Sequence, residues 1–268
     1  MKCKLLVLDL DGTLTNSQKE ITPRTLATLL RLQESGVQLV LASGRPTYGI
    51  VPLSRSLQME RFGGYILAYN GGKIIQVQGM ETIYEQVLPH SLVAPLHRAA
   101  TTAGAVILTY EGEYILTEQP QDKYVEHEIF LTKMLPKKVE NFTEAVTFDP
   151  DKCLIVGQPD TLPQLADTLN AQHGEQLSAY RSEPFFLEVV PKGIDKALSL
   201  NRLFAHVGCT AEDIVAVGDG FNDLTMIQLA GFGVAMANAQ EVVKEAANYV
   251  TLSNDEDGVA AMVEKYLL

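Results

Sequence analysis

Short apolar runs alternate with amphipathic stretches at the start of the chain. Leu5–Leu8 and Val37–Ala42 are mostly apolar and bounded by polar residues. Such runs are typical of strands buried on both faces of a parallel sheet. Between them, residues 23–36 place leucines at helical spacing, and Thr22 precedes them as a candidate N-cap. Strand, helix and strand in this order form a βαβ unit, which predicts a parallel sheet with a right-handed crossover.

The regular βα alternation breaks off in the middle of the chain. Tyr65–Tyr69 is a third apolar run, and the turn signal Asn70-Gly71-Gly72 leads from it into Lys73–Gln78, which predicts a hairpin. From about residue 83 to 187 helical and strand patterns follow one another without the βα order, which predicts an inserted α+β unit. Within it we expect helices near Ser91–Ala103 and Thr161–Gln172, and strands at Val106–Thr109, Tyr114–Leu116, Lys152–Val156 and Phe185–Val190.

The alternation resumes after the insertion, with a helix predicted over Asp195–Val207 and a strand over Ile214–Val217. The fold class that follows is α/β, a Rossmann-like doubly wound parallel-sheet core with an inserted α+β cap domain. We assign residues 1–82 and 188–268 to the core and residues 83–187 to the cap. The remaining core elements are expected at Asp223–Ala230, Gly233–Met236, Tyr249–Thr251 and in a helix from Gly258.

Composition and charge exclude several classes of function. Of 268 residues, 46% are hydrophobic and 20% are charged, which is typical of a folded globular protein. The net charge of −12 disfavours nucleic acid and anionic membranes as partners. The three cysteines lie far apart in the sequence, and no apolar run has the length of a membrane span or a secretion signal. We therefore expect a cytoplasmic protein with reduced thiols.

Polar side chains follow three of the predicted core strands at the point where each strand ends. Doubly wound sheets bind ligands just outside these carboxyl ends. Several carboxylates that converge there repel one another unless a divalent cation neutralises them, and oxygen ligands alone favour a hard ion such as Mg²⁺. The residues are Asp9 and Asp11 after the first strand, Ser43 after the second, and Asp219, Asn222 and Asp223 after Ile214–Val217, with Lys196 early in the helix after the insertion.

This set of side chains has the chemistry that phosphoryl transfer needs. Ser43, Lys196 and backbone N–H groups supply hydrogen-bond donors for the spread negative charge of a phosphoryl group. A carboxylate also acts as a nucleophile toward phosphorus and forms an aspartyl-phosphate. Asp9 is placed for that role, and Asp11 for proton transfer.

Four sequence motifs resemble those of the haloacid dehalogenase-like superfamily of phosphohydrolases. The large insertion between the second and third motifs resembles the α/β cap of the Cof-type phosphatases, and the resemblance covers essentially the whole chain. The resemblance therefore implies a Mg²⁺-dependent phosphatase that acts on a small phosphorylated metabolite. The motifs are Asp9-Leu10-Asp11-Gly12-Thr13, Ala42-Ser43-Gly44-Arg45, Lys192-Gly193-Ile194-Asp195-Lys196 and Gly218-Asp219-Gly220-Phe221-Asn222-Asp223.

The resemblance also implies a role for each matched residue. Asp9 becomes the nucleophile and a metal ligand, Asp11 the general acid and base with a metal-binding backbone carbonyl, and Asp219 the second carboxylate ligand. Asp223 orients Lys196 or the water around the metal. Of the two lysines in the third motif, Lys196 lies at the family's distance from the fourth, which leaves Lys192 as a loop residue. The phosphate-binding groups are Ser43, Lys196 and the Gly44 amide, assisted by the Leu10 amide and Asn222, with Arg45 and Asn70 as further contacts.

Other functions remain open at this level. The same aspartyl-phosphate serves a phosphotransferase or phosphomutase, and the active-site residues do not separate these from a hydrolase. A non-catalytic phosphoacceptor switch is a rival of a different class, but such receivers are shorter and lack the Gly-Thr pair after the acidic residues. In relatives the cap recognises substrates as different as sugar phosphates, flavin mononucleotide and pyridoxal phosphate, and residues 83–187 contain no specificity code that we recognise.

Overall fold

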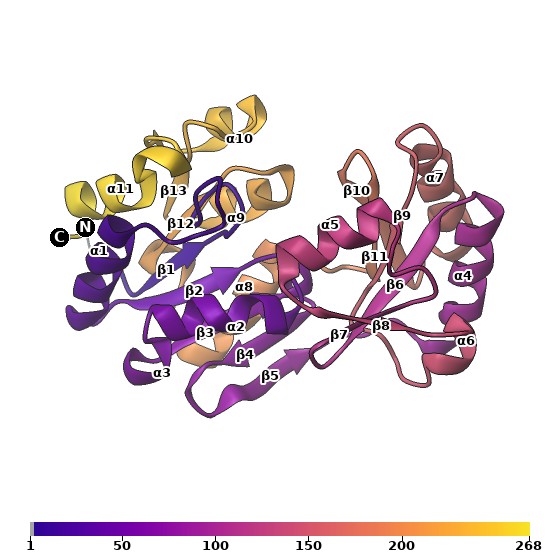
Figure 1. The fold of residues 1–268 in the computed structure, drawn as a ribbon. Coiled ribbons are helices and arrows are strands. Elements are labelled where there is room, and N and C mark those ends of the chain that lie inside the picture. The colour runs from indigo at the N-terminus through magenta and orange to yellow at the C-terminus, as the bar shows by residue number, and fades with distance from the viewer. Residues whose placement is uncertain (1–2) are drawn as a thin grey trace. The chain divides into compact units, whose positions relative to one another are not determined.

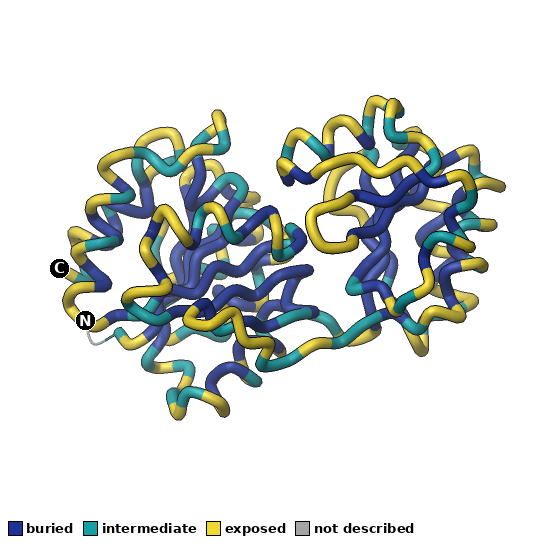
Figure 2. Tube along the Cα trace, turned by 60° about the horizontal axis from the view of Figure 1, so that its bottom comes forward, coloured by how far each residue is buried: buried dark blue, intermediate teal, exposed yellow. Residues whose placement is uncertain are grey.

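Two separate β-sheets organise the part of the chain that the computed structural model describes, residues 3–268 (Figure 1). Each sheet belongs to its own compact unit. The first unit combines the residues up to Tyr84 with Asp195–Leu268, and the second is the continuous segment Glu85–Ile194. In both units the central strands are buried, whereas β5 and β8 and the outward sides of the helices are largely exposed (Figure 2).

The sheet of the first unit has eight strands in the order β14-β13-β12-β1-β2-β3-β4-β5. Every pair from β14 to β3 is parallel, and β4 turns back antiparallel on β3, so both the predicted parallel sheet and the predicted hairpin are present. The strands are β1 (Leu5–Leu8), β2 (Gln38–Ala42), β3 (Gly64–Ala68), β4 (Lys73–Gln76), β5 (Glu81–Glu85), β12 (Ile214–Gly218), β13 (Phe232–Ala235) and β14 (Tyr249–Val250).

Helix α1 of this unit begins where the sequence predicts, whereas α2, α3 and α10 were not predicted. Thr22 caps α1 by accepting a hydrogen bond from the Thr25 amide, as its position predicts. Helix α1 packs against α11, where Arg24 and Thr28 both donate hydrogen bonds to the Glu264 carboxylate. The helices are α1 (Pro23–Glu34), α2 (Thr47–Ser56), α3 (Met59–Phe62), α8 (Lys196–Val207), α9 (Leu224–Leu229), α10 (Glu241–Ala246) and α11 (Gly258–Tyr266).

Helix α2 is absent from the sequence-based expectation. It begins directly after Pro46 and contains Pro52 in its interior, where proline normally ends or kinks a helix. The helix forms because its inner side, which includes Gly49, Ile50 and Ser54, is buried. Tertiary packing therefore overrides the local propensity here.

The second unit has a six-stranded sheet in the order β10-β11-β9-β6-β7-β8. All pairs are antiparallel except β7 with β8, which fits the predicted α+β character. Strands β8 and β10 and helices α5 and α6 were not predicted. The elements are α4 (Val93–Thr102), β6 (Val106–Glu111), β7 (Tyr114–Thr117), α5 (Lys123–Thr132), β8 (Leu135–Lys138), α6 (Phe142–Ala145), β9 (Cys153–Val156), α7 (Leu162–His173), β10 (Leu177–Glu183) and β11 (Phe186–Pro191).

The two faces of this second sheet differ in polarity. One face forms an apolar core with α4 and α7, in which Ile107, Ile155 and Leu187 pack with helix residues such as Leu96 and Leu169. Strand residues alternate, so the neighbours of these side chains point to the other face. That face carries buried charged groups that an apolar pattern does not predict.

A buried ion pair lies among them. Lys152 Nζ and Glu188 Oε2 are 2.7 Å apart, and their side chains are 3% and 8% exposed. Glu188 also accepts a hydrogen bond from Ser182, and the Lys152 ammonium group lies 5.3 Å from the centre of the Tyr110 ring. The Tyr110 hydroxyl in turn donates to Glu128 of α5 at 2.7 Å. The Lys152–Glu188 pair and Glu128 are therefore linked through Tyr110 in one buried network.

We expect Lys152→Met to lower the free energy of unfolding by about 3–5 kcal/mol, because it leaves the Glu188 carboxylate buried without its cation. The measurement is urea denaturation followed by circular dichroism. The matched control is Lys137→Met, which breaks a 3.0 Å pair with Glu111 whose side chains are both 48% exposed. That change should cost at most about 1 kcal/mol. Equal effects of the two substitutions would contradict the assignment.

Candidate active site

The register of the first sheet brings the ends of three strands to one edge. Leu8 of β1 lies opposite Leu41 of β2 on one side and Val217 of β12 on the other. The strands run parallel, so the residues that follow them emerge together. These residues are Asp9, Ser43 and Asp219.

Three carboxylates and one ammonium group form the centre of this edge. One oxygen from each of Asp9, Asp219 and Asp223 lies within 4.8 Å of the others. Lys196 Nζ donates to Asp9 Oδ1 at 2.6 Å and to Asp223 Oδ1 at 2.5 Å. Lys196 is only 1% exposed, so this contact is almost completely shielded from water. The sequence predicted that these four residues lie close together, although it gave Asp223 only the role of orienting Lys196 or the water around the metal.

Local structure positions Lys196 and Asp223, the two charged residues beside Asp9. Asp195 caps helix α8 by accepting hydrogen bonds from the Ala197 and Leu198 amides, which makes Lys196 the first residue of the helix. Asp223 Oδ2 accepts the backbone N–H groups of Asp219 and Gly220, both at 2.9 Å. The helix cap therefore sets where Lys196 begins α8, and backbone N–H groups of its own loop hold the Asp223 carboxylate.

The crowding of charge shifts the pKa values at this centre. Burial raises the pKa of Asp9 well above its usual value, and the charges of Asp223 and Asp219 add to the rise while Lys196 opposes it. Burial likewise raises the pKa of Asp219 to about 6, with a contribution from Asp223 and a partial offset from the Thr13 hydrogen bond. Burial alone lowers the pKa of Lys196, but Asp223 and Asp9 raise it overall. One ammonium group therefore does not fully compensate three carboxylates.

The donor set fits a divalent cation with oxygen ligands. Mg²⁺ binds carboxylates and relieves their mutual repulsion, and none of the three residues in the cluster is a nitrogen or sulfur ligand. Gly12 leaves space for Asp219, because a Cβ atom at residue 12 would lie 2.4 Å from Asp219 Oδ2. The backbone φ of +88° at Gly12 also favours glycine. Asp219 can therefore approach the turn after β1, and one of its oxygens lies within 4.8 Å of an oxygen of Asp9, the other carboxylate predicted as a ligand.

Asp11 lies apart from this cluster in its side-chain contacts. Its carboxylate receives Arg45 Nε on Oδ2 at 2.7 Å and Arg45 Nη2 on Oδ1 at 2.6 Å. Lys19 Nζ adds a third contact, to Oδ1 at 2.8 Å. Burial by itself raises the pKa of Asp11, but the hydrogen bonds and positive charges of Arg45 and Lys19 outweigh it and lower the pKa. Asp11 is therefore held as a carboxylate in this structure.

Three of the predicted phosphate-binding residues, Ser43, Gly44 and Asn222, lie close to Asn70. The backbone N–H of Asn70 donates to the Ser43 carbonyl at 2.9 Å. The side-chain amide of Asn222 donates to Asn70 Oδ1 at 3.0 Å. A Cβ atom at Gly44 would lie 3.2 Å from Asn70 Nδ2, so the second motif and Asn70 approach closely. Leu10 is fully buried, and its carbonyl accepts the Thr15 amide in the turn that follows β1.

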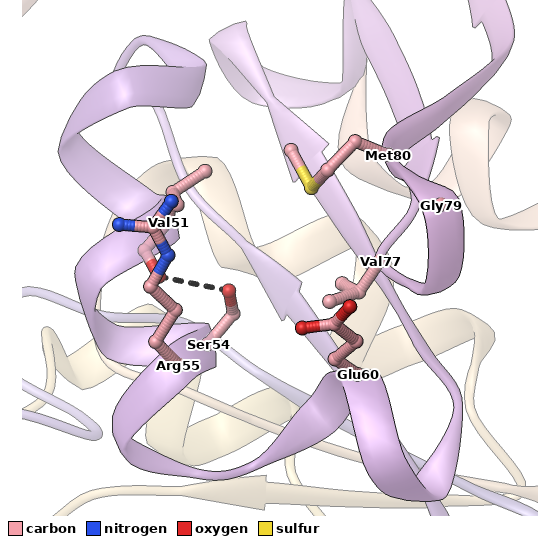
Figure 3. A pocket seen from close by; sticks show the side chains of 7 residues that line it. All are labelled: Val51, Ser54, Arg55, Glu60, Val77, Gly79 and Met80. Carbon is pink, nitrogen blue, oxygen red and sulfur yellow. Dashed lines mark hydrogen bonds between the residues drawn. The ribbon is translucent and has the colours of Figure 1, made fainter.

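A pocket of about 360 Å³ lies elsewhere in the first unit (Figure 3). Val77 and Met80 form its apolar side, and the charged groups of Arg55 and Glu60 line it from the ends of α2 and α3. None of the residues that line it belongs to the acidic cluster. The candidate site is therefore identified by its charged groups, and this pocket is a separate feature.

Comparison with known proteins agrees with this geometry. Residues 6–263 match the family described as haloacid dehalogenase-like hydrolase. The chain belongs to this family. A haloacid dehalogenase-like hydrolase from Bacteroides thetaiotaomicron is 54% identical, with a TM-score of 0.96 over 98% of this chain and 99% of that one.

Two further relatives carry the names of enzymes. The 5-amino-6-(5-phospho-D-ribitylamino)uracil phosphatase YitU of Bacillus subtilis is 31% identical over 98% of this chain and 97% of its own. The pyridoxal phosphate phosphatase YbhA of Escherichia coli is 26% identical over the full length of both. These findings confirm the predicted family, its α/β fold and the predicted class of enzyme, a phosphatase.

Sequence reasoning missed two contacts in the site of this hydrolase. Thr13 donates to Asp219 Oδ1 at 2.6 Å, and its place in the first motif was the available signal. Lys19 contacts Asp11 from a loop that carries no motif, and nothing in the sequence pattern singles it out. Arg45, named as a further contact, binds the carboxylate of Asp11 in this structure.

Among the described residues, no helix has the length and apolar character needed to cross a membrane.

Lys196→Met should destabilise this hydrolase by about 3–5 kcal/mol in the absence of divalent cations, because it leaves two buried carboxylates without their ammonium partner. Lys192→Met is the matched control, since Lys192 is an exposed residue of the same motif. We expect the control to change stability by less than about 0.5 kcal/mol. Chemical denaturation of the three proteins tests the expectation, and a comparable loss in Lys192→Met would show that the wrong lysine was chosen.

Proposed function

We propose that this hydrolase cleaves small phosphate monoesters with the Asp9 carboxylate as the nucleophile and Mg²⁺ as its cofactor. The observation that carries the proposal is the buried contact of Asp9 with Lys196 beside Asp219 and Asp223, at the carboxyl edge of a parallel sheet. A carboxylate held in this way has a fixed orientation, because Oδ1 is bound to the ammonium group. Fixed orientation of the attacking group is a large part of enzymatic rate enhancement.

The reaction has two steps in this proposal. Asp9 attacks phosphorus and the ester P–O bond breaks. Asp11, which takes up a proton from solvent when the Arg45 contact to its Oδ2 gives way, passes that proton to the departing alkoxide. Water then attacks the phosphorylated Asp9, Asp11 takes a proton from that water, and inorganic phosphate leaves with the Asp9 carboxylate restored. General acid–base catalysis of this kind contributes typically about 10²–10⁴-fold.

Asp9, Asp219 and the Asp11 backbone carbonyl are the proposed Mg²⁺ ligands. Bound there, Mg²⁺ would neutralise charge that develops on the phosphoryl oxygens. Asp223 supports the set by holding Lys196. Ser43 and Lys196 with the amides of Gly44 and Leu10 are the proposed phosphate donors, and Asn222 assists them.

The proposed substrates are small phosphorylated metabolites. The support is that relatives named above act on a ribitylamino-uracil phosphate and on pyridoxal phosphate. Every residue with a proposed chemical role belongs to the first unit, so we assign recognition of the rest of the substrate to the inserted unit. The proposal includes a cytoplasmic location, which the three free cysteines fit.

Asp9→Asn should reduce phosphate release by at least about 10³-fold while the fold is kept, because an amide is a far weaker nucleophile. Turnover is measured by phosphate release, and folding by circular dichroism. Rapid quenching of the wild-type enzyme should also show one phosphoryl group on a peptide that contains Asp9. Asp160→Asn, the same change at an exposed loop residue, is the control. A variant that keeps turnover within tenfold of wild type would overturn the mechanism.

Removal of divalent cations by chelation should abolish activity, and Mg²⁺ should restore it. Ca²⁺ should inhibit, because its larger and looser coordination disturbs in-line geometry. Asp219→Asn should raise the Mg²⁺ concentration for half-maximal activity by at least about tenfold. The same shift should appear in the protection that Mg²⁺ gives against thermal unfolding, which does not depend on turnover. Full activity after exhaustive chelation would contradict the assignment of a metal.

A further inference from the structure

Both oxygens of the Asp11 carboxylate are occupied, and they are occupied unequally. Oδ1 receives two donors, Arg45 Nη2 at 2.6 Å and Lys19 Nζ at 2.8 Å, whereas Oδ2 receives Arg45 Nε at 2.7 Å. A carboxylate that exchanges a proton with substrate or water needs one oxygen released from such contacts. Oδ2, with fewer donors, is the oxygen that exchanges more readily, and Oδ1 is the anchored one.

Lys19 reaches Asp11 from an unusual backbone conformation. Its φ is +63°, in the left-handed region that costs a non-glycine residue about 1 kcal/mol or more. The loop around it is closed by Asn16, whose side-chain oxygen accepts the amides of Gln18 and Glu20, both at 3.0 Å. Asn16 also bonds through its backbone to Glu20 and Lys19. The direction of the Lys19 side chain is therefore set by a tight turn.

This turn is fastened to the C-terminal part of the chain. Ser17 donates its amide and its hydroxyl to the Asp255 carboxylate at 2.8 and 2.6 Å. Asn254 donates to the Thr15 carbonyl at 3.0 Å, and Asn238 donates to the Gly12 carbonyl at 2.8 Å. The segment from Gly12 to the turn is thus held at several points. Lys19 and Asp11 are fixed relative to each other by contacts outside the acidic cluster.

We propose that Lys19 is a positioning residue that anchors Oδ1 of Asp11 while Oδ2 transfers the proton. The proposal rests on the proposed function of Asp11 and adds to it a residue outside the four motifs. When the Arg45 contact to Oδ2 gives way to substrate or water, the Lys19 contact keeps the carboxylate in place. Loss of Lys19 should therefore impair proton transfer while substrate binding and folding are retained.

Lys19→Met tests this role, because methionine keeps the length of the apolar stem and removes the ammonium group. We expect kcat for an alkyl phosphate to fall by about tenfold, a part of the range for acid–base catalysis. An aryl phosphate, whose leaving group needs less proton assistance, should lose less than about threefold. KM should stay within about twofold for both esters. Lys19→Arg should recover most of the loss, and Gln18→Met, an exposed neighbour in the same turn, is the matched control.

A double-mutant cycle with Asp11→Asn separates positioning from a general structural effect. If Lys19 acts through Asp11, the double variant should match Asp11→Asn within about twofold on either ester. Additive losses, an equal loss on both esters, or a kcat for Lys19→Met at or above the wild-type value would overturn the proposal.

The same data separate this inference from the proposed function. A selective loss on the alkyl ester in Asp11→Asn, together with an unchanged Lys19→Met enzyme, overturns the role of Lys19 alone. Equal losses on both esters in Asp11→Asn overturn the proton-transfer role of Asp11, and the role of Lys19 with it.

Discussion

The arrangement of the acidic cluster in the first unit depends on the buried Lys196 ammonium group, which offsets part of the negative charge of three carboxylates. Lys196 binds Asp9 and Asp223 at once, and it does so as the first residue of α8, where Asp195 caps the helix. Removal of such a group from water is costly unless its partners are placed well. The parallel register of β1 with β12, the backbone bonds to Asp223 and the glycine at residue 12 supply that placement. Much of the local structure at this edge serves to bring like charges together around one cation.

The parts of the fold that were predictable are those in which local signals agree with tertiary structure. The apolar runs of β1, β2 and β12 and the Thr22 cap of α1 belong to this class. Helix α2 was missed because Pro52 in its interior opposes its formation locally, and packing decides the outcome. Strand β8 was missed because Leu135–Lys138 is exposed throughout and contains a proline, so its sequence has no apolar alternation. Helix α5 was missed because its buried side includes the polar residues Glu128 and Thr132, so the sequence shows no continuous apolar stripe there.

The candidate site divides along a similar line. Asp9, Ser43, Lys196 and Asp219 were predictable because each stands at a strand or helix end, where sequence order implies spatial convergence. The contacts of Asp11 were not predictable, since Lys19 approaches it from an irregular turn whose geometry depends on Asn16 and on residues near the C-terminus. The buried Lys152–Glu188 pair shows the same limit in the second unit, because Lys152 directly precedes β9, Glu188 lies in β11, and both face away from the apolar core. Lys19, Lys152 and Glu188 lie outside the four motifs, so only the fold shows which residues they contact.

The position of the second unit as a continuous insertion has a consequence for the order in which the protein forms during translation. Asp9 and Lys196 are separated by 187 positions, so at about 5–20 residues per second the ribosome needs roughly 10–40 s to supply the partner of Asp9. Glu85–Ile194 is complete by then and contains its own sheet, whereas β1 still lacks β12 as a neighbour. On the proposed mechanism, a nascent chain has no assembled catalytic centre, and we expect released fragments that end before β12 to be inactive. Activity would then arise only in the last quarter of synthesis, after the part of the chain assigned to recognition has emerged.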